Sequence, residues 1–369
     1  MRVMILSFNA GEGHNSAAKA LKEDFILHGV HCDIEDTMSL ISPRLSRFIS
    51  NGFVFMYRYI PALFNYGYKY AEDHPSLFGQ GTWVYKIFIL AVKKMLDDIE
   101  TGGYDTVICT HPFSAVMLTA ALEARPLNIK TAFVDTDYTC HPSTDQSKVD
   151  RYYIPDDTLT EEFTKKGLPK DHLVPSGIPI RQMFVSIKDK QTAKAELDIH
   201  GKHHMVMMCG SMGCGPIKKL AHHISEGLSQ DDMLSIVCGN NKKLKNSLEK
   251  RYSGNKNIRV LGFVTDISTL MDSCDLYITK PGGISTSEAT SKRLPMAFIA
   301  AVAGCEMYNK DFFVKKGAAI AEKDTKKLAE RCLCLLHDDE TLKAMSAAFK
   351  DMPNRNAADI IVNDISKVS

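Results

Sequence analysis

The chain has 369 residues, enough for two domains that each bury a hydrophobic core. Hydrophobic residues make up 44% and charged residues 24%, as in ordinary globular proteins, and 45 Lys and Arg balance 44 Asp and Glu. This balance gives no support to a nucleic-acid partner, and no apolar run approaches the roughly 18 residues that span a membrane. The chain begins with a strand-like run and no secretory leader, so we expect a cytoplasmic protein.

The first predicted strand, over residues 3–8, leads into a glycine-rich turn that contains Gly13 and His14, and an alanine-rich helix follows. Such a turn places the N-terminus of the helix at the carboxyl edge of a parallel sheet, where α/β folds bind ligands. The imidazole of His14 would lie beside a helix terminus that favours anions and would accept a proton near neutral pH. A capping or surface histidine is the alternative interpretation of this turn.

Residues 40–95 interrupt the alternation of strands and helices. Nine of the 31 aromatic residues in the chain lie between positions 48 and 70, and basic residues are interleaved with them. Most apolar positions here form one helical stripe, but Phe55 and Tyr57 fall outside it. Aromatic and basic residues together favour the headgroup layer of an anionic membrane or a groove for a lipid-bearing acceptor. Ordinary helical packing is the alternative.

The alternation resumes with predicted strands over 104–110 and 130–134, each followed by polar residues. His111, Asp137 and His141 are therefore candidates for the mouth of one cleft. A short strand over 152–155 and a helix over 156–166 follow. Residues 174–181 contain two prolines and a glycine, which indicates an inter-domain connection. We expect domains at 1–180 and 181–369.

The second half repeats a single plan four times. Predicted strands over 205–208, 234–237, 258–261 and 276–278 each run into a glycine turn. In a parallel sheet all four turns lie at the same edge, and together they indicate a pocket for a nucleotide. A loop over 303–309 is expected at that edge too, where Glu306 and Asn309 would hold sugar hydroxyls.

The fourth of these turns has the most specific chemistry. Gly282 and Gly283 let the backbone approach a ligand closely, and Ser285 and Thr286 offer hydroxyls at the start of a helix. The positive end of that helix favours phosphate. Glu288, in the first turn, would accept hydrogen bonds from a ribose. An ordinary helix N-terminus is the alternative interpretation of this stretch taken alone.

Several segments together form a pattern that is more specific than any single turn. They are residues 11–14, 17–21, 136–137, 141, 149–152, 176–181, 237–244, 261–265, 279–283, 288–289, 306 and 309. Through nearly its whole length the chain resembles the glycosyltransferases that make monogalactosyl- and glucosyl-diacylglycerol. These enzymes are relatives of the peptidoglycan lipid-intermediate N-acetylglucosaminyltransferase. The family usually has Pro-Gly-Gln-Glu where this chain has Ala303-Gly304-Cys305-Glu306, and the glutamine that contacts the donor sugar is therefore missing.

The resemblance implies an α/β protein of GT-B architecture, in which two Rossmann-like domains with parallel sheets face each other across a cleft. Residues 1–180 would face acceptor and membrane, and residues 181–369 would bind the UDP-sugar. His14 would be the catalytic base of an inverting hexose transfer to diacylglycerol or a similar lipid. The acceptor-side candidates are Gly13, Phe55, Tyr57, Asp137 and His141. The donor-side candidates are Ser211, Met212, Gly213, Gly262, Phe263, Val264, Gly282, Gly283, Ser285, Thr286, Glu288, Glu306 and Asn309.

The expected partners are a UDP-hexose, a lipid acceptor and the anionic inner face of the cell membrane, without nucleic acid. No cofactor is expected besides the donor substrate. The ten cysteines lack the paired spacing of zinc ligands, and no carboxylate pair has a clear metal role, so we expect no metal. The alternatives are a GT-B transferase for another acceptor, such as a polyprenyl-linked sugar, and a non-catalytic regulator that binds nucleotide sugars. Glucose, galactose and N-acetylhexosamine all remain open as the donor sugar.

Overall fold

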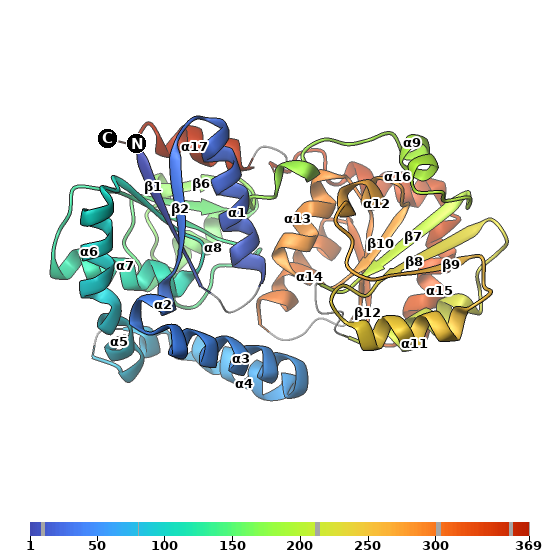
Figure 1. The fold of residues 1–369 in the computed structure, drawn as a ribbon, viewed down its shortest axis with the longest axis horizontal. Helices are drawn as coiled ribbons and strands as arrows, with labels where there is room; N and C mark the ends of the chain where they lie inside the picture. The colour runs from blue at the N-terminus through green and yellow to red at the C-terminus, as the bar shows by residue number, and fades with distance from the viewer. Residues whose placement is uncertain (9–11, 80, 211–214, 300–303, 354–356, 369) are drawn as a thin grey trace. The chain divides into compact units, whose positions relative to one another are not determined.

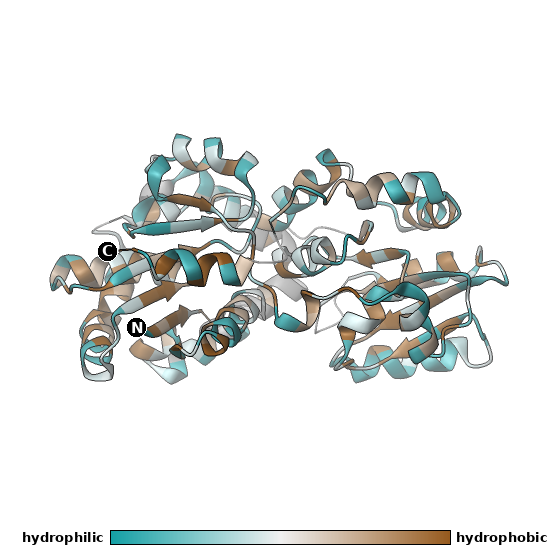
Figure 2. Ribbon diagram, turned by 90° about the horizontal axis from the view of Figure 1, so that it is seen from above, coloured by the Kyte–Doolittle hydropathy of each residue, from teal (hydrophilic) through white to brown (hydrophobic). Residues whose placement is uncertain are grey.

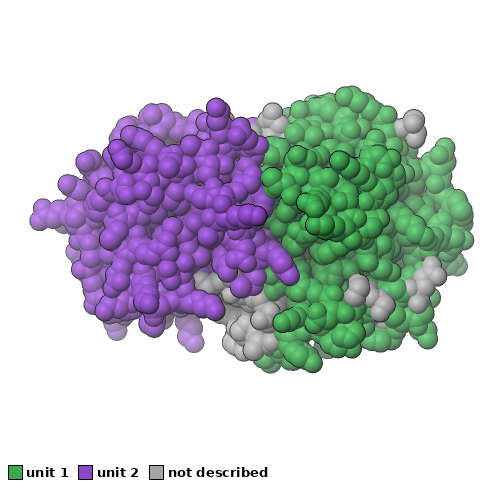
Figure 3. Space-filling view, turned by 180° about the vertical axis from the view of Figure 1, so that it is seen from behind, with its two compact units in different colours: residues 1–182, 302–305, 353–369 green, residues 183–301, 306–352 purple. Residues whose placement is uncertain are grey.

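The computed structural model describes residues 1–8, 12–79, 81–210, 215–299, 304–353 and 357–368 (Figure 1). The chain folds into two compact units (Figure 3). Unit 1 comprises Met1–Gln182, Val302–Cys305 and Pro353–Ser369. Unit 2 comprises Met183–Ala301 and Glu306–Met352.

The C-terminal segment corrects the expected division of the chain. The change of unit at Gln182 and Met183 lies close to the expected boundary, but residues 353–369 belong to unit 1 and not to the second domain. The physical reason is the apolar face of α17 (Ala357–Ile365), which packs on α1 (Glu12–Leu27) and β1 (Arg2–Ser7). Ile361 and Ile365 are completely buried in that core.

Unit 1 is built on a parallel sheet of six strands in the order β2-β1-β3-β4-β5-β6. Besides β1, the strands are β2 (His31–Asp36), β3 (Thr106–Cys109), β4 (Lys130–Val134), β5 (Arg151–Ile154) and β6 (Leu173–Pro175). The central strands are buried along almost their entire length, which is typical of a parallel sheet covered on both faces. Pro175 lies in the edge strand, where a missing N–H is tolerated.

The helices of unit 1 fall into two groups. One group covers the sheet and consists of α1, α17, α6 (Val92–Gly102), α7 (Pro112–Ala124) and α8 (Thr160–Lys165). The other group fills residues 37–91: α2 (Thr37–Ile41), α3 (Pro43–Tyr59), α4 (Pro61–Asp73), α5 (Trp83–Phe88) and the short helix η2 (Ile89–Ala91). The helices α3 and α4 pack on each other. Proline stands at the first position of α3, α4 and α7, where a helix needs no N–H donor.

Unit 2 repeats the architecture with the strand order β12-β11-β10-β7-β8-β9, again all parallel. The strands are β7 (His203–Met208), β8 (Asp232–Val237), β9 (Ile258–Leu261), β10 (Leu276–Thr279), β11 (Met296–Ile299) and β12 (Ala319–Glu322). The helices are α9 (Lys190–Glu196), α10 (Ile217–Ser225), α11 (Lys242–Tyr252), α12 (Ile267–Asp272), α13 (Gly283–Ser291), α14 (Cys305–Lys315), α15 (Thr325–Leu336) and α16 (Asp339–Ala347). Figure 2 shows apolar strands and hydrophilic residues on the helices around them.

The four strands that precede the predicted glycine turns are contiguous in this sheet, in the order β10-β7-β8-β9. Because all pairs are parallel, the turns after them lie at one edge, as expected. Two predicted connections are wrong. Residues 173–175 form the strand β6, and the expected loop over 303–309 is helical from Cys305 onward. Within the described residues, no helix has both the length and the apolar content that crossing a bilayer requires.

Candidate active site

Three neighbouring strands of unit 1 bring their carboxyl ends to His14. His14 is the third residue of α1, which follows β1. Its Nδ1 lies 2.9 Å from the carbonyl oxygen of Thr110, which follows β3, and 2.8 Å from Oγ1 of Thr136, which follows β4. A carbonyl oxygen only accepts hydrogen bonds, so Nδ1 must carry the proton. Nε2 of the neutral ring therefore has the free lone pair.

Burial determines the charge of this imidazole. It lowers the pKa of His14 to about 4, although the hydrogen bond to Thr110 acts in the opposite direction. The ring is therefore neutral at pH 7, and Nε2 is available as a proton acceptor. A pKa this far below 7 makes it a weaker base than a free histidine, but one that is fully in the accepting form.

Two further histidines lie close to His14. The ring of His111 meets His14 edge-on at a centroid distance of 4.5 Å, and its Nδ1 accepts a hydrogen bond from the backbone N–H of Phe113 at 3.1 Å. His141 accepts from the N–H of Ser143 at Nδ1, also at 3.1 Å. Burial lowers the pKa of both rings, that of His141 to about 3. Both are neutral imidazoles with the proton on Nε2, the opposite tautomer from His14.

The carboxylates after β4 occupy different environments. Asp135 is 4% exposed and accepts a hydrogen bond from the N–H of Asp137 at 3.2 Å. Burial, together with the charge of Asp137, holds the pKa of Asp135 well above its usual range. Asp137 is half-buried and lies on the same edge as His14 and His141. Gly13 precedes His14 in the first turn of α1 and is half-buried.

Gly304 and Cys305, two residues of the segment that departs from the family pattern, belong to unit 1 and contact its helix α4. Sγ of Cys305 lies 3.1 Å from the hydroxyl of Tyr68 on α4, and the ring of Tyr68 meets His141 edge-on at 5.8 Å. Gly304 has φ +75°, and a Cβ there would be 2.9 Å from the ring of Tyr68. Only glycine fits this position without displacing the tyrosine. Burial raises the pKa of both Tyr68 and Cys305, so both are protonated at neutral pH.

In unit 2, the turn after β10 leaves the start of α13 open. Gly282 is the N-cap of α13, without a side-chain hydrogen bond, and a Cβ on it would meet nothing within 4 Å. A helix start of this kind directs backbone N–H groups and the positive end of its dipole outward. Gly283 is buried and Ser285 half-buried. Thr286 is completely buried, and its hydroxyl donates to the carbonyl oxygen of Gly283 at 2.9 Å, so it stabilises the helix instead of facing a ligand.

The first turns of α14 contain Glu306 and Asn309, which the sequence analysis places in a loop. Asn309 is completely buried, and its Nδ2 donates to the carbonyl oxygen of Pro281 at 3.0 Å. Glu306 lies 3.5 Å from Nζ of Lys280. Both contacts tie α14 to the turn between β10 and α13. Glu288, 7% exposed, lies in the second turn of α13.

The turn after β9 presents an aromatic surface. Phe263 is 67% exposed, and its neighbours Gly262 and Val264 are half-buried. An exposed phenylalanine at the carboxyl edge of a sheet offers a stacking surface for a flat ring. Ser211, Met212 and Gly213 lie outside the described residues, as does the side chain of Tyr57. Phe55 on α3 is 53% exposed.

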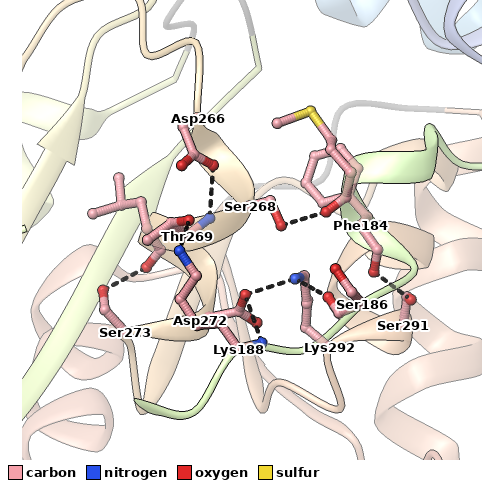
Figure 4. Close-up of polar contacts among 12 residues, drawn as sticks. Phe184, Ser186, Lys188, Asp266, Ser268, Thr269, Asp272, Ser273, Ser291 and Lys292 are labelled. Atoms are coloured by element: carbon pink, nitrogen blue, oxygen red, sulfur yellow. Dashed lines mark hydrogen bonds and ion pairs between the residues drawn. The ribbon is translucent and has the colours of Figure 1, made fainter. Parts of the chain in front are cut away.

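A buried ion pair supports α13 from its C-terminal end (Figure 4). Nζ of Lys292 lies 2.8 Å from Oδ2 of Asp272, and the two side chains are 1% and 3% exposed. Lys292 also donates to the carbonyl oxygen of Ser186, and the backbone N–H of Lys188 donates to Asp272. The segment that enters unit 2 is thus fixed to both α12 and α13. Ser291 reinforces this by donating to the carbonyl oxygen of Phe184.

Sequence reasoning located the two edges but missed several residues in them. Thr110 and Thr136 follow β3 and β4, yet their contacts with His14 depend on strand order, which the sequence does not show. The ion pair of Lys292 with Asp272 has no sequence signal, because charged residues in a predicted helix normally face solvent.

Two families match the chain. Residues 14–180 match the family described as monogalactosyldiacylglycerol synthase, and residues 216–352 match glycosyl transferases group 1. The processive diacylglycerol beta-glucosyltransferase of Bacillus subtilis (strain 168) is 30% identical, over 100% of this chain and 95% of its own length. The enzyme of the same name from Bacillus cereus (strain AH187) is 28% identical, over 99% of this chain and 93% of its own length.

Solved structures confirm the expected GT-B fold class. Acinetobacter baumannii MurG is similar with a TM-score of 0.65 and 12% identity, over 100% of this chain and 99% of the other. The complex of Staphylococcus aureus MnaA with UDP is similar with a TM-score of 0.63 and 14% identity, over 99% of this chain and 96% of the other. At these identities the likeness concerns the fold alone.

Proposed function

Since the chain belongs to the glycosyltransferase family of monogalactosyldiacylglycerol synthases and processive diacylglycerol glucosyltransferases, we propose that it transfers a hexose from a UDP-sugar to a lipid hydroxyl. The acceptor is diacylglycerol or a similar membrane lipid, and the anomeric carbon is inverted. The observation that carries this proposal is the neutral His14, with its proton on Nδ1 and its lone pair on Nε2, at the carboxyl edge of the sheet of unit 1.

In the proposed reaction, the acceptor hydroxyl attacks the anomeric carbon while Nε2 of His14 takes its proton. The bond from the anomeric carbon to the diphosphate oxygen breaks, and UDP leaves with its negative charge. Thr110 and Thr136 hold the imidazole through Nδ1 during this transfer. A base positioned in this way typically contributes about 10²–10⁴-fold to the rate.

The donor edge of unit 2 supplies groups suited to a nucleoside diphosphate. The uncapped start of α13 at Gly282 favours the diphosphate, because its N–H groups and helix dipole stabilise negative charge as it develops. Glu288 would accept from ribose hydroxyls, and the exposed ring of Phe263 would lie against the uracil. Gly262, Val264, Glu306 and Asn309 shape these turns.

We further propose that helices α3 to α5 and η2 contact the anionic inner face of the cell membrane. Phe48 is 76% exposed and Tyr66 71%, an arrangement that costs free energy in water and gains it in a bilayer interface. We call the exposed large apolar residues of this segment the aromatic face; they are Phe48, Phe55, Met56, Ile60, Leu63, Tyr66, Tyr70, Trp83, Ile89 and Leu90. Exposed basic residues on the same helices complement anionic headgroups; they are Arg44, Arg47, Lys69 and Lys86.

The decisive experiment offers the purified protein a panel of UDP-glucose, UDP-galactose and UDP-N-acetylglucosamine with phosphatidylglycerol vesicles that contain either diacylglycerol or a polyprenyl-linked sugar. We expect one donor to give a hexosyl-diacylglycerol that mass spectrometry identifies. Transfer to a polyprenyl-linked sugar but not to diacylglycerol would contradict the proposal that diacylglycerol is the acceptor. Binding of UDP without any transfer would indicate the non-catalytic regulator instead.

A further inference from the structure

His111 connects the candidate base to the hydrophobic core of unit 1. Its ring stacks on Phe8, with the centroids 4.4 Å apart and the planes 20° apart, and it meets His14 edge-on at 4.5 Å. Phe8 is 5% exposed and His111 8%. The His14 ring therefore contacts a side chain that is itself buried.

A second contact to His14 comes from the same dipeptide. The carbonyl oxygen of Thr110, which accepts the proton of His14 Nδ1, belongs to the peptide bond that leads into His111. His111 is the N-cap of α7, and its Nδ1 accepts from the N–H of Phe113. The start of α7 thus fixes both the tautomer and the plane of the His111 ring, together with the direction of the carbonyl before it.

We propose that His111 is a positioning residue, whose ring holds the imidazole of His14 so that Nδ1 stays on Thr110 and Nε2 faces the acceptor hydroxyl. This inference rests on the proposed role of His14 as the general base. Without the ring of His111, the imidazole gains room to rotate about its Cβ–Cγ bond. Each rotated conformer directs the lone pair away from the substrate and lowers the population that reacts.

The cap and the ring of His111 can be tested separately. His111→Asn keeps an acceptor for the N–H of Phe113 but removes the ring. We expect kcat to fall about 10- to 100-fold, with the KM for the UDP-sugar unchanged and the melting temperature close to wild type. His111→Phe keeps a ring between Phe8 and His14 but removes the acceptor. We expect it to recover most of the lost kcat at a lower melting temperature.

The tautomer of His14 gives a readout that does not depend on activity. In ¹⁵N spectra of histidine-labelled protein, wild-type His14 should show the proton on Nδ1 alone, and His111→Asn should show a mixture of tautomers. His172→Asn is the matched control. His172 is also a histidine of unit 1 whose Nδ1 contacts a backbone carbonyl, that of Val149 at 3.1 Å, and its loss should leave both kcat and the His14 signal unchanged.

Two results would overturn the inference. One is a wild-type kcat and an unchanged His14 tautomer in His111→Asn. The other is an equal loss of kcat in His111→Phe and His111→Asn, because a ring at this position would then not restore the rate. The inference can also be separated from the proposed function. If His14→Ala is fully active while His111→Asn changes the tautomer of His14, His14 is not the general base, but His111 still positions its ring.

Discussion

The two sheets end in edges of opposite construction. The edge of unit 1 consists of side chains: three neutral imidazoles and a buried carboxyl, each hydrogen-bonded to a backbone group. For His14 that group follows a neighbouring strand, and for the other three it lies two residues further along the chain. The edge of unit 2 offers mainly backbone: glycine turns and an uncapped helix start, beside the exposed ring of Phe263, while the polar side chains of Thr286 and Asn309 hold the turns together. Proton transfer needs one group with one orientation and one pKa, whereas a diphosphate is stabilised by several weak dipoles. The same architecture would thus serve both proposed tasks through different parts of the chain.

The largest expected effect comes from removing the side chain on which the edge of unit 1 depends. His14→Ala should lower kcat about 10²–10⁴-fold, because the variant loses the Nε2 lone pair that is proposed to take the proton. Binding of UDP, measured by calorimetry, should stay near wild type, since UDP is proposed to bind at the edge of unit 2. A loss of UDP binding equal to the loss of kcat would contradict this separation of roles.

The next largest effect is expected from the buried ion pair of Lys292 with Asp272, which supports α13 at the edge of unit 2. Lys292→Met leaves Asp272 buried without its partner, and we expect a loss of about 3–5 kcal/mol in the free energy of unfolding, measured with urea. The double variant Asp272→Leu with Lys292→Met should regain most of the lost free energy of unfolding, because it no longer buries the unpaired carboxylate of Asp272.

Lys165→Met is the matched control for this pair. It breaks an ion pair of similar distance, 2.7 Å, whose side chains are 73% and 78% exposed. The free energy of unfolding should change little in this variant. A loss as large as that of Lys292→Met would mean that burial is not what makes the Lys292 pair important.

The acid limb of the pH profile tests the chemistry of the imidazole edge. Below its pKa of about 4, His14 carries a proton on Nε2 and cannot accept another. We expect kcat/KM to stay flat on the acid side from pH 7 to 5 and to fall about tenfold per unit at pH values well below 4. The groups facing this ring, His111 and His141, have lowered pKa values too and stay neutral over the flat region. An acid limb near pH 6.5 would show that burial does not lower the pKa of His14.

A methyl group added to the backbone edge should have a smaller effect. Gly282 has φ −80° and open space at its Cβ position, so Gly282→Ala should leave the melting temperature unchanged. The methyl would lie where the diphosphate approaches the helix, and we expect UDP to bind about tenfold more weakly, a change of about 1.4 kcal/mol. Unchanged binding in a folded variant would place the diphosphate elsewhere.

The smallest expected effect lies outside both edges, on the aromatic face. Phe48→Ser and Phe55→Ser should each weaken sedimentation with phosphatidylglycerol vesicles about three- to tenfold, because each removes an apolar side chain from the interface. The fold should be unaffected, since both side chains are exposed. Phe25→Ser, which alters a completely buried ring, would instead destabilise unit 1. Equal sedimentation of wild type and the two surface variants would argue against the aromatic face as the surface that contacts the membrane.

The sequence contains the period of the strands and the places where they end, but not their order. The predicted strands over 130–134 and 258–261 match β4 and β9, because apolar runs between glycine turns have few other ways to fold. The meeting of Thr110, Thr136 and His14 follows from β1, β3 and β4 being neighbours, which no local pattern encodes. Asn309 is polar in a polar stretch and was expected in a loop, yet it is buried because Pro281 offers its amide a partner.

The return of α17 to unit 1 has a consequence for how the molecule comes into being. The helix that carries His14 packs on α17, which follows all of unit 2 along the chain. A ribosome therefore releases all of unit 2 before unit 1 can close its core, so the half synthesised first is completed last. The donor edge can form while the chain is still being made. The contact of α17 with α1 forms only after unit 2 has been synthesised, so a chain that terminates before α17 would lack this support for the helix of His14.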